Sequence, residues 1–125
     1  MLPRPLASGP RFDVFVLDRG DHGRVDQPAW EWLRSLPPER RGRMLHIVQK
    51  HATSGPLRNV QVPRDLGDNI YEFKTMAGDR LLYFYDPDRR TVLTNGFSKR
   101  DSLRVAKSRA MRMREEWRKW NSPKR

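Results

Sequence analysis

The 125-residue chain contains no cysteine and lacks most of the features that mark membrane or secreted proteins. Without cysteine it can form no disulfide, no thiol nucleophile and no cysteine-ligated metal centre. Its longest apolar run covers residues 81–85, far short of the roughly 20 residues that a membrane span needs. The first ten residues lack the continuous apolar segment of a signal peptide. These absences predict a cytoplasmic protein.

Common catalytic signatures are missing as well. The sequence contains no glycine-rich phosphate loop and no serine-centred elbow motif. Of its three histidines, His46 and His51 are five residues apart on a predicted helix and therefore on different faces, which argues against a shared metal. Each histidine, His22 included, is predicted to be solvated or to cap an element. The sequence thus predicts neither a metal nor a cofactor.

Positive charge is what the chain has in excess. Lysine and arginine number 26 against 15 acidic residues, a net charge of +11, and residues 98–125 alone carry eleven basic and three acidic residues. Arginine outnumbers lysine 20 to 6, and its planar fork suits phosphate groups and stacks on bases. The pattern favours a nucleic acid or a nucleoprotein as the target. An acidic protein partner, or a GC-rich genome, is the alternative explanation.

The spacing of apolar residues predicts a small α+β domain with the order β-α-α-β-β-β-α. Asp26 is the expected N-cap of the first helix. Residues 1–10, with three prolines, are expected to be a flexible segment, residues 11–120 a single domain and residues 121–125 a basic tail. The expected elements are a strand over 11–17, helices ending near 36 and spanning 38–52, strands over 69–75, 80–85 and 91–97, and a helix over 101–120.

The last three strands, joined by short turns, predict an antiparallel meander. The helices are expected to cover one face of the sheet in a two-layer arrangement and to leave the other face partly open as a binding surface. Alternation along residues 69–75 places Tyr71 and Phe73 on one face and Glu72 and Lys74 on the other.

Basic residues of the meander are predicted to converge at one end of the sheet. Lys74 ends one strand, Arg80 begins the next, and Lys99 and Arg100 follow the last. Antiparallel pairing brings these positions together. Several cations that acids do not neutralise would form a phosphate site. The alternative is that they are ordinary solvated charges at the edge of the sheet.

Three short motifs in this region together resemble the RelE/ParE toxin superfamily, and more narrowly its HigB-like, phage-derived branch. They are YEFK at 71–74, RLLY at 80–83 and GFSKR at 96–100, in the order and spacing typical of that branch. The resemblance covers about residues 57–110 and implies a small RelE-like fold. It also implies the toxin of a type II toxin–antitoxin system.

Toxins of this kind act as metal-independent mRNA interferases, cleaving mRNA in the ribosomal A site by attack of a ribose 2′-OH on the adjacent phosphate. The resemblance therefore implies an endoribonuclease without a cofactor. The implied partners are mRNA, the ribosome and a cognate antitoxin, often a helix-turn-helix protein.

By motif position, the resemblance implies catalytic roles for five residues of this chain. Arg80 matches the arginine that clamps the scissile phosphate, and Lys74 a basic residue that stabilises the phosphate or transfers a proton. Lys99 and Arg100 match a basic pair that acts on leaving-group charge and ribosomal RNA. Glu72 is expected to orient Lys74 or Arg80 through a salt bridge.

Further expectations concern RNA binding, which is predicted for Tyr71, Arg104 and Lys107. The general base stays open. Some family members place a catalytic tyrosine where this chain has Ala106, and others place a histidine near the end of the last strand, where it has none. The tyrosines at positions 71, 83 and 85 are the alternatives, and core packing is the competing role for the last two.

Two other functions remain open from the sequence. One is a non-enzymatic gyrase poison, as in the ParE-like arm of the superfamily. The other is a catalytically inactive relative that binds RNA or protein. A winged-helix DNA-binding domain is the alternative fold, since two helices precede a hairpin.

Overall fold

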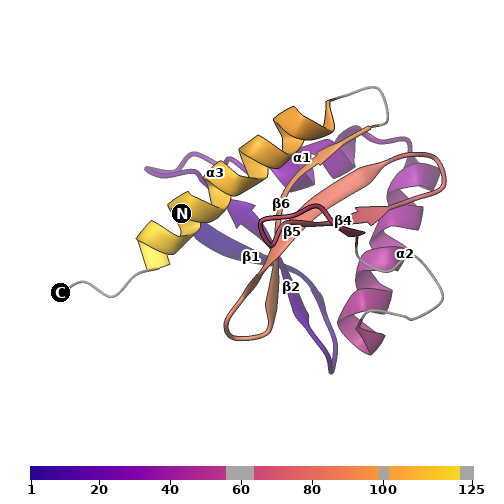
Figure 1. The fold of residues 1–125 in the computed structure, drawn as a ribbon, viewed down its shortest axis with the longest axis horizontal. Helices are drawn as coiled ribbons and strands as arrows, with labels where there is room; N and C mark the ends of the chain where they lie inside the picture. Colours follow the sequence, from indigo (N-terminus) through magenta and orange to yellow (C-terminus); the bar gives the residue numbers. More distant parts are fainter. Residues whose placement is uncertain (56–63, 99–101, 122–125) are drawn as a thin grey trace.

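The computed structural model describes residues 1–55, 64–98 and 102–121, and it confirms the α+β class (Figure 1). Within these ranges the elements are β1 (Leu2–Ser8), β2 (Asp13–Asp18), α1 (Pro28–Ser35), α2 (Pro38–Ser54), β3 (Arg64–Asp65), β4 (Tyr71–Lys74), β5 (Arg80–Asp86), β6 (Arg90–Phe97) and α3 (Leu103–Asn121). The predicted helices and strands are all present, and β1 and β3 were not predicted.

The strands form one sheet in the order β1-β2-β6-β5-β4-β3. The predicted meander of β4, β5 and β6 is antiparallel. The sheet as a whole is mixed, however, because β2 pairs in parallel with β6. The chain leaves β2 through both helices before it enters the meander, and a crossover of that kind allows parallel pairing.

The N-terminal segment is a strand, so the expectation of a flexible lead-in is wrong. β1 pairs antiparallel with β2 from Leu2 opposite Asp18 to Ser8 opposite Asp13. Proline is tolerated in such an edge strand because a missing N–H on the solvent side costs no ladder hydrogen bond. Arg4 strengthens the pairing, with its Nε 3.1 Å from a carboxylate oxygen of Asp18. As a result, β1 covers the edge that β2 would otherwise expose.

Asp26 is not the N-cap that the sequence predicted. α1 begins at Pro28, and the N-cap position is Gln27, without a side-chain cap. The backbone N–H of Asp26 instead donates to a carboxylate oxygen of Asp18 at 3.1 Å, and Gly20 N–H donates to the same oxygen at 2.9 Å. Asp18, 2% exposed, thus organises the loop between β2 and α1.

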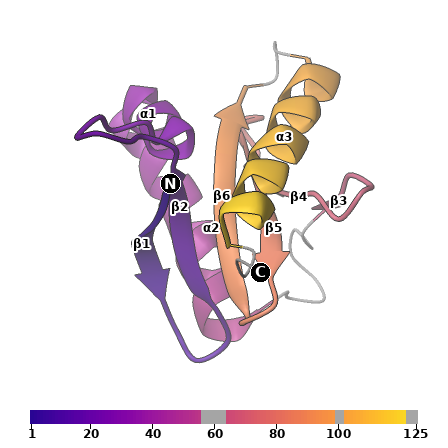
Figure 2. The ribbon, with the colours of Figure 1, turned by 90° about the vertical axis from the view of Figure 1, so that its left-hand side faces the viewer.

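Helices cover both faces of the sheet, so the predicted two-layer arrangement is wrong. α1 and α2 pack on one face and α3 on the other (Figures 1 and 2). The core beneath α1 and α2 contains Val14, Val16, Ala29, Leu33, Leu36, Met44, Val48, Ala52, Phe73, Leu81, Tyr83 and Leu93. The core beneath α3 contains Leu17, Ile70, Leu82, Phe84, Val92, Phe97, Ala106, Ala110, Met113 and Trp117. The central strand β5 is apolar on both sides, and each apolar face needs its own cover.

Candidate functional site

Lys74 and Arg80 lie opposite one another where β4 and β5 meet at one end of the sheet. Arg80 also pairs with Phe97, the last residue of β6, so the ends of all three meander strands come together here. Phe97 belongs to the core beneath α3, which places Arg80 and its neighbour Lys74 on the α3 face. Lys99 and Arg100, predicted to complete the cluster, lie outside the described residues.

Arg80 is held between an acid and an aromatic ring. Its Nη1 lies 3.6 Å from Oε2 of Glu72, and its guanidinium carbon lies 5.5 Å from the ring centroid of Phe97. The Arg80 side chain is 18% exposed and that of Glu72 fully buried. An ion pair and a cation–π contact on two sides restrict the guanidinium to few orientations. The geometry therefore places Glu72 where the sequence expected an orienting acid.

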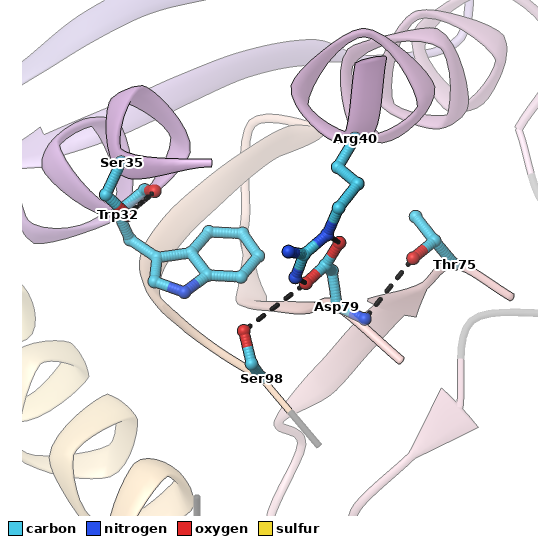
Figure 3. Close-up of polar contacts among 6 residues, drawn as sticks. All are labelled: Trp32, Ser35, Arg40, Thr75, Asp79 and Ser98. Atoms are coloured by element: carbon cyan, nitrogen blue, oxygen red, sulfur yellow. Dashed lines mark hydrogen bonds and ion pairs between the residues drawn. The ribbon is translucent and has the colours of Figure 1, made fainter. Parts of the chain in front are cut away.

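A second ion pair, missed from the sequence, lies at the turn just before Arg80. Asp79 is fully buried, and Arg40 of α2 approaches its carboxylate with two nitrogens (Figure 3). Ser98 Oγ donates to the same carboxylate at 3.3 Å. An aspartate in a tight turn is usually a turn former, so the local sequence did not point to an ion pair. The only signal in the sequence was that Asp79 directly precedes Arg80.

The tyrosines proposed as alternative bases lie on the other face of the sheet. Tyr83 is fully buried, and its ring stacks with that of Tyr71, with centroids 5.8 Å apart. Burial raises the pKa of Tyr83 far above its usual 10 and also raises that of Tyr85. These side chains pack with α1 and α2, while Arg80 faces α3. The sheet thus separates Tyr71 from the Lys74–Arg80 pair.

Ala106, which stands where some family members carry a catalytic tyrosine, belongs to the core. It is 7% exposed on the inner face of α3, and its carbonyl oxygen accepts a hydrogen bond from Asn95 Nδ2 at 3.2 Å. A tyrosine at this position would have to displace packed core residues. The side chain at position 106 therefore offers no group for acid–base chemistry.

The two predicted RNA-binding residues of α3 differ in their surroundings. Arg104 is exposed in the first turn of the helix. Lys107 is paired with Asp68, with Nζ 2.9 Å from Oδ2, and the lysine lowers the pKa of that carboxyl. Arg104 thus presents its charge to solvent, whereas the charge of Lys107 is partly compensated.

No group of three histidine, aspartate or glutamate side chains in the described ranges is arranged to hold a metal ion. Nor is any helix within those ranges both long and apolar enough to cross a membrane.

Comparison with known proteins identifies one family model that covers most of the chain. The model described as "Phage derived protein Gp49-like (DUF891)" matches residues 31–115. This range begins in α1 and includes all five residues predicted to be catalytic. A search of curated proteins finds no match.

One similar solved structure is the toxin–antitoxin complex RelBE2 from Mycobacterium tuberculosis. It is 19% identical in sequence, the similarity covers 78% of this chain and 95% of that chain, and the TM-score is 0.35. The family match, which spans well over half of the chain, agrees with the phage-derived branch that the sequence motifs resemble. The chain belongs to the Gp49-like family of phage-derived proteins.

Proposed function

We propose that this protein is a ribosome-dependent mRNA endonuclease, the toxin of a type II toxin–antitoxin pair. The observation that supports this most is the placement of Arg80 beside Lys74, with Glu72 and Phe97 holding the guanidinium. Two adjacent cations, one of them restrained, suit a phosphodiester whose negative charge grows during reaction. Restraint matters because a group that is already oriented needs no reorganisation at the moment of reaction.

In the proposed reaction the 2′-oxygen attacks the adjacent phosphorus while the bond from phosphorus to the 5′-oxygen breaks. The products are a 2′,3′-cyclic phosphate and a 5′-hydroxyl. One proton leaves the attacking hydroxyl and one is delivered to the leaving oxygen, so the step needs a base and an acid but no cofactor. Arg80 binds the non-bridging oxygens, and Lys74 stabilises the same charge or transfers a proton. Lys99 and Arg100 are assigned to the leaving group and ribosomal RNA.

The surface charge supports a ribosomal target in this proposal. Arg104 and the other exposed arginines of α3 supply a basic face that suits ribosomal RNA, with Lys107 contributing less because Asp68 compensates it. Tyr71 lies on the opposite face of the sheet, so any stacking of a base on it would be separate from the Lys74–Arg80 pair. The cognate antitoxin would neutralise the toxin with an acidic or amphipathic segment.

The test is induction of the chain in cells followed by mapping of new mRNA 5′ ends. New ends inside translated frames are expected for the wild type and should be lost in Arg80→Ala. Arg34→Ala, which removes an exposed arginine from α1, is the matched control and should cleave like the wild type. Cleavage that persists in Arg80→Ala would exclude the assigned site.

The position of Ala106 and the tyrosines favours one alternative, a relative that binds RNA or protein without cleaving it. The absence of both growth arrest and cleavage on induction would support that alternative. Growth arrest with intact mRNA would instead indicate another target such as gyrase.

A further inference from the structure

The fully buried carboxylate of Asp79 connects the candidate site to α2. Arg40 Nε lies 2.9 Å from Oδ2 of Asp79, and Arg40 Nη2 contacts Oδ1. Ser98, just beyond β6, donates its hydroxyl to Oδ1 at 3.3 Å. Figure 3 shows the guanidinium of Arg40 reaching down from its helix to the turn that carries Asp79. One side chain of the β4–β5 turn is thus bound to both α2 and the end of β6.

The turn itself does not need this ion pair. Thr75 N–H donates to Asp79 O at 3.0 Å and Gly78 N–H donates to Thr75 O at 3.0 Å, so backbone hydrogen bonds already close the turn. Gly78, with φ 90°, supplies the left-handed conformation that the turn requires. Burying a carboxylate costs free energy unless a partner compensates it. The pair therefore adds something that turn formation alone does not require.

The ion pair of Arg40 with Asp79 adds a fixed direction for the next residue, Arg80. Asp79 directly precedes β5 and is anchored to α2, whereas Arg80, the first residue of β5, faces the α3 side, so the anchored residue sets the direction in which the chain enters the strand. A bidentate arginine–carboxylate pair fixes an angle as well as a distance. Lys74 lies opposite Arg80 in the ladder, so the same turn joins the two residues.

We propose that Arg40 and Asp79 are positioning residues, which hold Arg80 in the orientation that binds the reacting phosphate. This inference rests on the proposed nuclease function. It predicts that loosening the pair lowers the rate of the chemical step rather than the affinity for the substrate, because Arg40 acts through Arg80.

The test is steady-state cleavage of mRNA on programmed ribosomes by purified Arg40→Gln and Arg40→Lys. Arg40→Gln should lower kcat roughly ten- to a hundredfold, the cost of a small misplacement of a reacting group, with KM for ribosomes close to that of the wild type. Arg40→Lys keeps the charge without the fork and should be intermediate. Arg43→Gln is the matched control, because among the described residues Arg43 pairs only with exposed Glu39, one turn earlier in the helix. It should retain the wild-type kcat.

A double variant separates positioning from simple loss of stability. In an Arg80→Lys background, where the retained cation should leave a residual cleavage rate, Arg40→Gln should lower the Tm as it does alone but should cause a smaller fractional loss of rate than in the wild type. An equal fractional loss of rate in both backgrounds, or a wild-type kcat for Arg40→Gln, would overturn the proposal.

A readout without cleavage keeps the positioning proposal testable if the nuclease proposal fails. The Nε–H resonance of Arg80 in a ¹⁵N NMR spectrum, assigned by its loss in Arg80→Lys, should shift and broaden in Arg40→Gln and stay unchanged in Arg43→Gln. Wild-type protein that cleaves no ribosome-bound mRNA would exclude the proposed function. An Arg80 signal that is the same with and without Arg40 would exclude the positioning role.

Discussion

His51 is a titratable side chain that folding removes from water. It is 4% exposed, its ring stacks on Phe12 with centroids 4.6 Å apart, and its Nε2 lies 3.0 Å from Thr91 Oγ1. The expectation that every histidine is solvated or caps an element is wrong for this one. Its spacing from Met44 and Val48 on the inner face of α2 was the signal that could have identified it.

This burial predicts a pH-dependent stability. Burial lowers the pKa of His51 from 6.5 to about 4, so between these values the unfolded chain binds the extra proton and the folded protein does not. The free energy of unfolding should therefore fall as the pH drops through this window, by up to about 3 kcal/mol. Neighbouring Tyr83 and Tyr85 do not contribute, because burial raises the pKa of both.

Urea denaturation from pH 7.5 to 4 checks the prediction. His51→Gln should flatten the slope relative to the wild type across this window, whereas His46→Gln, at an exposed position on the same helix, should leave the slope unchanged. An unchanged slope in His51→Gln would show that other groups cause the pH dependence.

At the scale of elements, the close packing of α1 against β6 requires a glycine at position 96. A Cβ added at Gly96 would lie 2.1 Å from two ring atoms of Trp32, far inside any real contact. The glycine of the family-like GFSKR motif therefore has a packing reason of its own, independent of any chemistry.

Gly96→Ala should consequently lower the free energy of unfolding by about 1–3 kcal/mol, the usual cost of overpacking. Gly42→Ala is the control, since Gly42 lies within α2 with nothing within 4 Å of an added Cβ. That variant should gain about 0.5–1 kcal/mol through helix propensity. Chemical denaturation measures both, and Trp32→Leu should restore part of the loss in Gly96→Ala. An unaffected Gly96→Ala would mean that α1 shifts at little cost.

At the scale of the whole molecule, the net charge of +11 is concentrated toward α3. Part of this positive charge is neutralised by ion pairs within the structure. Lys107 pairs with Asp68, and Arg19 binds Glu116 with two hydrogen bonds of 2.9 and 2.8 Å. Arg104, Arg109 and Arg112 remain exposed on the helix. These three are among the charges that the fold leaves available to a polyanion.

Affinity for a single-stranded RNA should therefore fall with salt, and the α3 arginines should set much of the slope. Replacing Arg104, Arg109 and Arg112 together with alanine should reduce the slope of log K against log salt concentration by about 2, since each phosphate contact contributes about 0.7. Replacing Arg24, Arg34 and Arg43, exposed residues outside α3, removes the same charge and should change the slope less. Fluorescence anisotropy with a labelled oligonucleotide measures both. Equal changes of slope in the two triple variants would indicate that net charge alone sets the salt dependence.

Much of the architecture was set by local pattern. Alternation identified β2 and β4, apolar segments between short turns identified β5 and β6, and the apolar stripe of Ala106, Ala110, Met113 and Trp117 identified α3. Turn residues fixed the antiparallel meander, and with it the pairing of Lys74 with Arg80. These features depend on neighbours in the chain, so the sequence by itself determined them.

What only the tertiary structure decided depends on contacts between distant segments. β1 exists because β2 offers an unpaired edge, and α3 covers a second face because β5 is apolar on both sides. The same holds for Arg40 and Asp79, which are 39 positions apart in the sequence and meet only because α2 packs over the β4–β5 turn. A buried ion pair requires two groups brought together by packing, and no local pattern encodes that meeting.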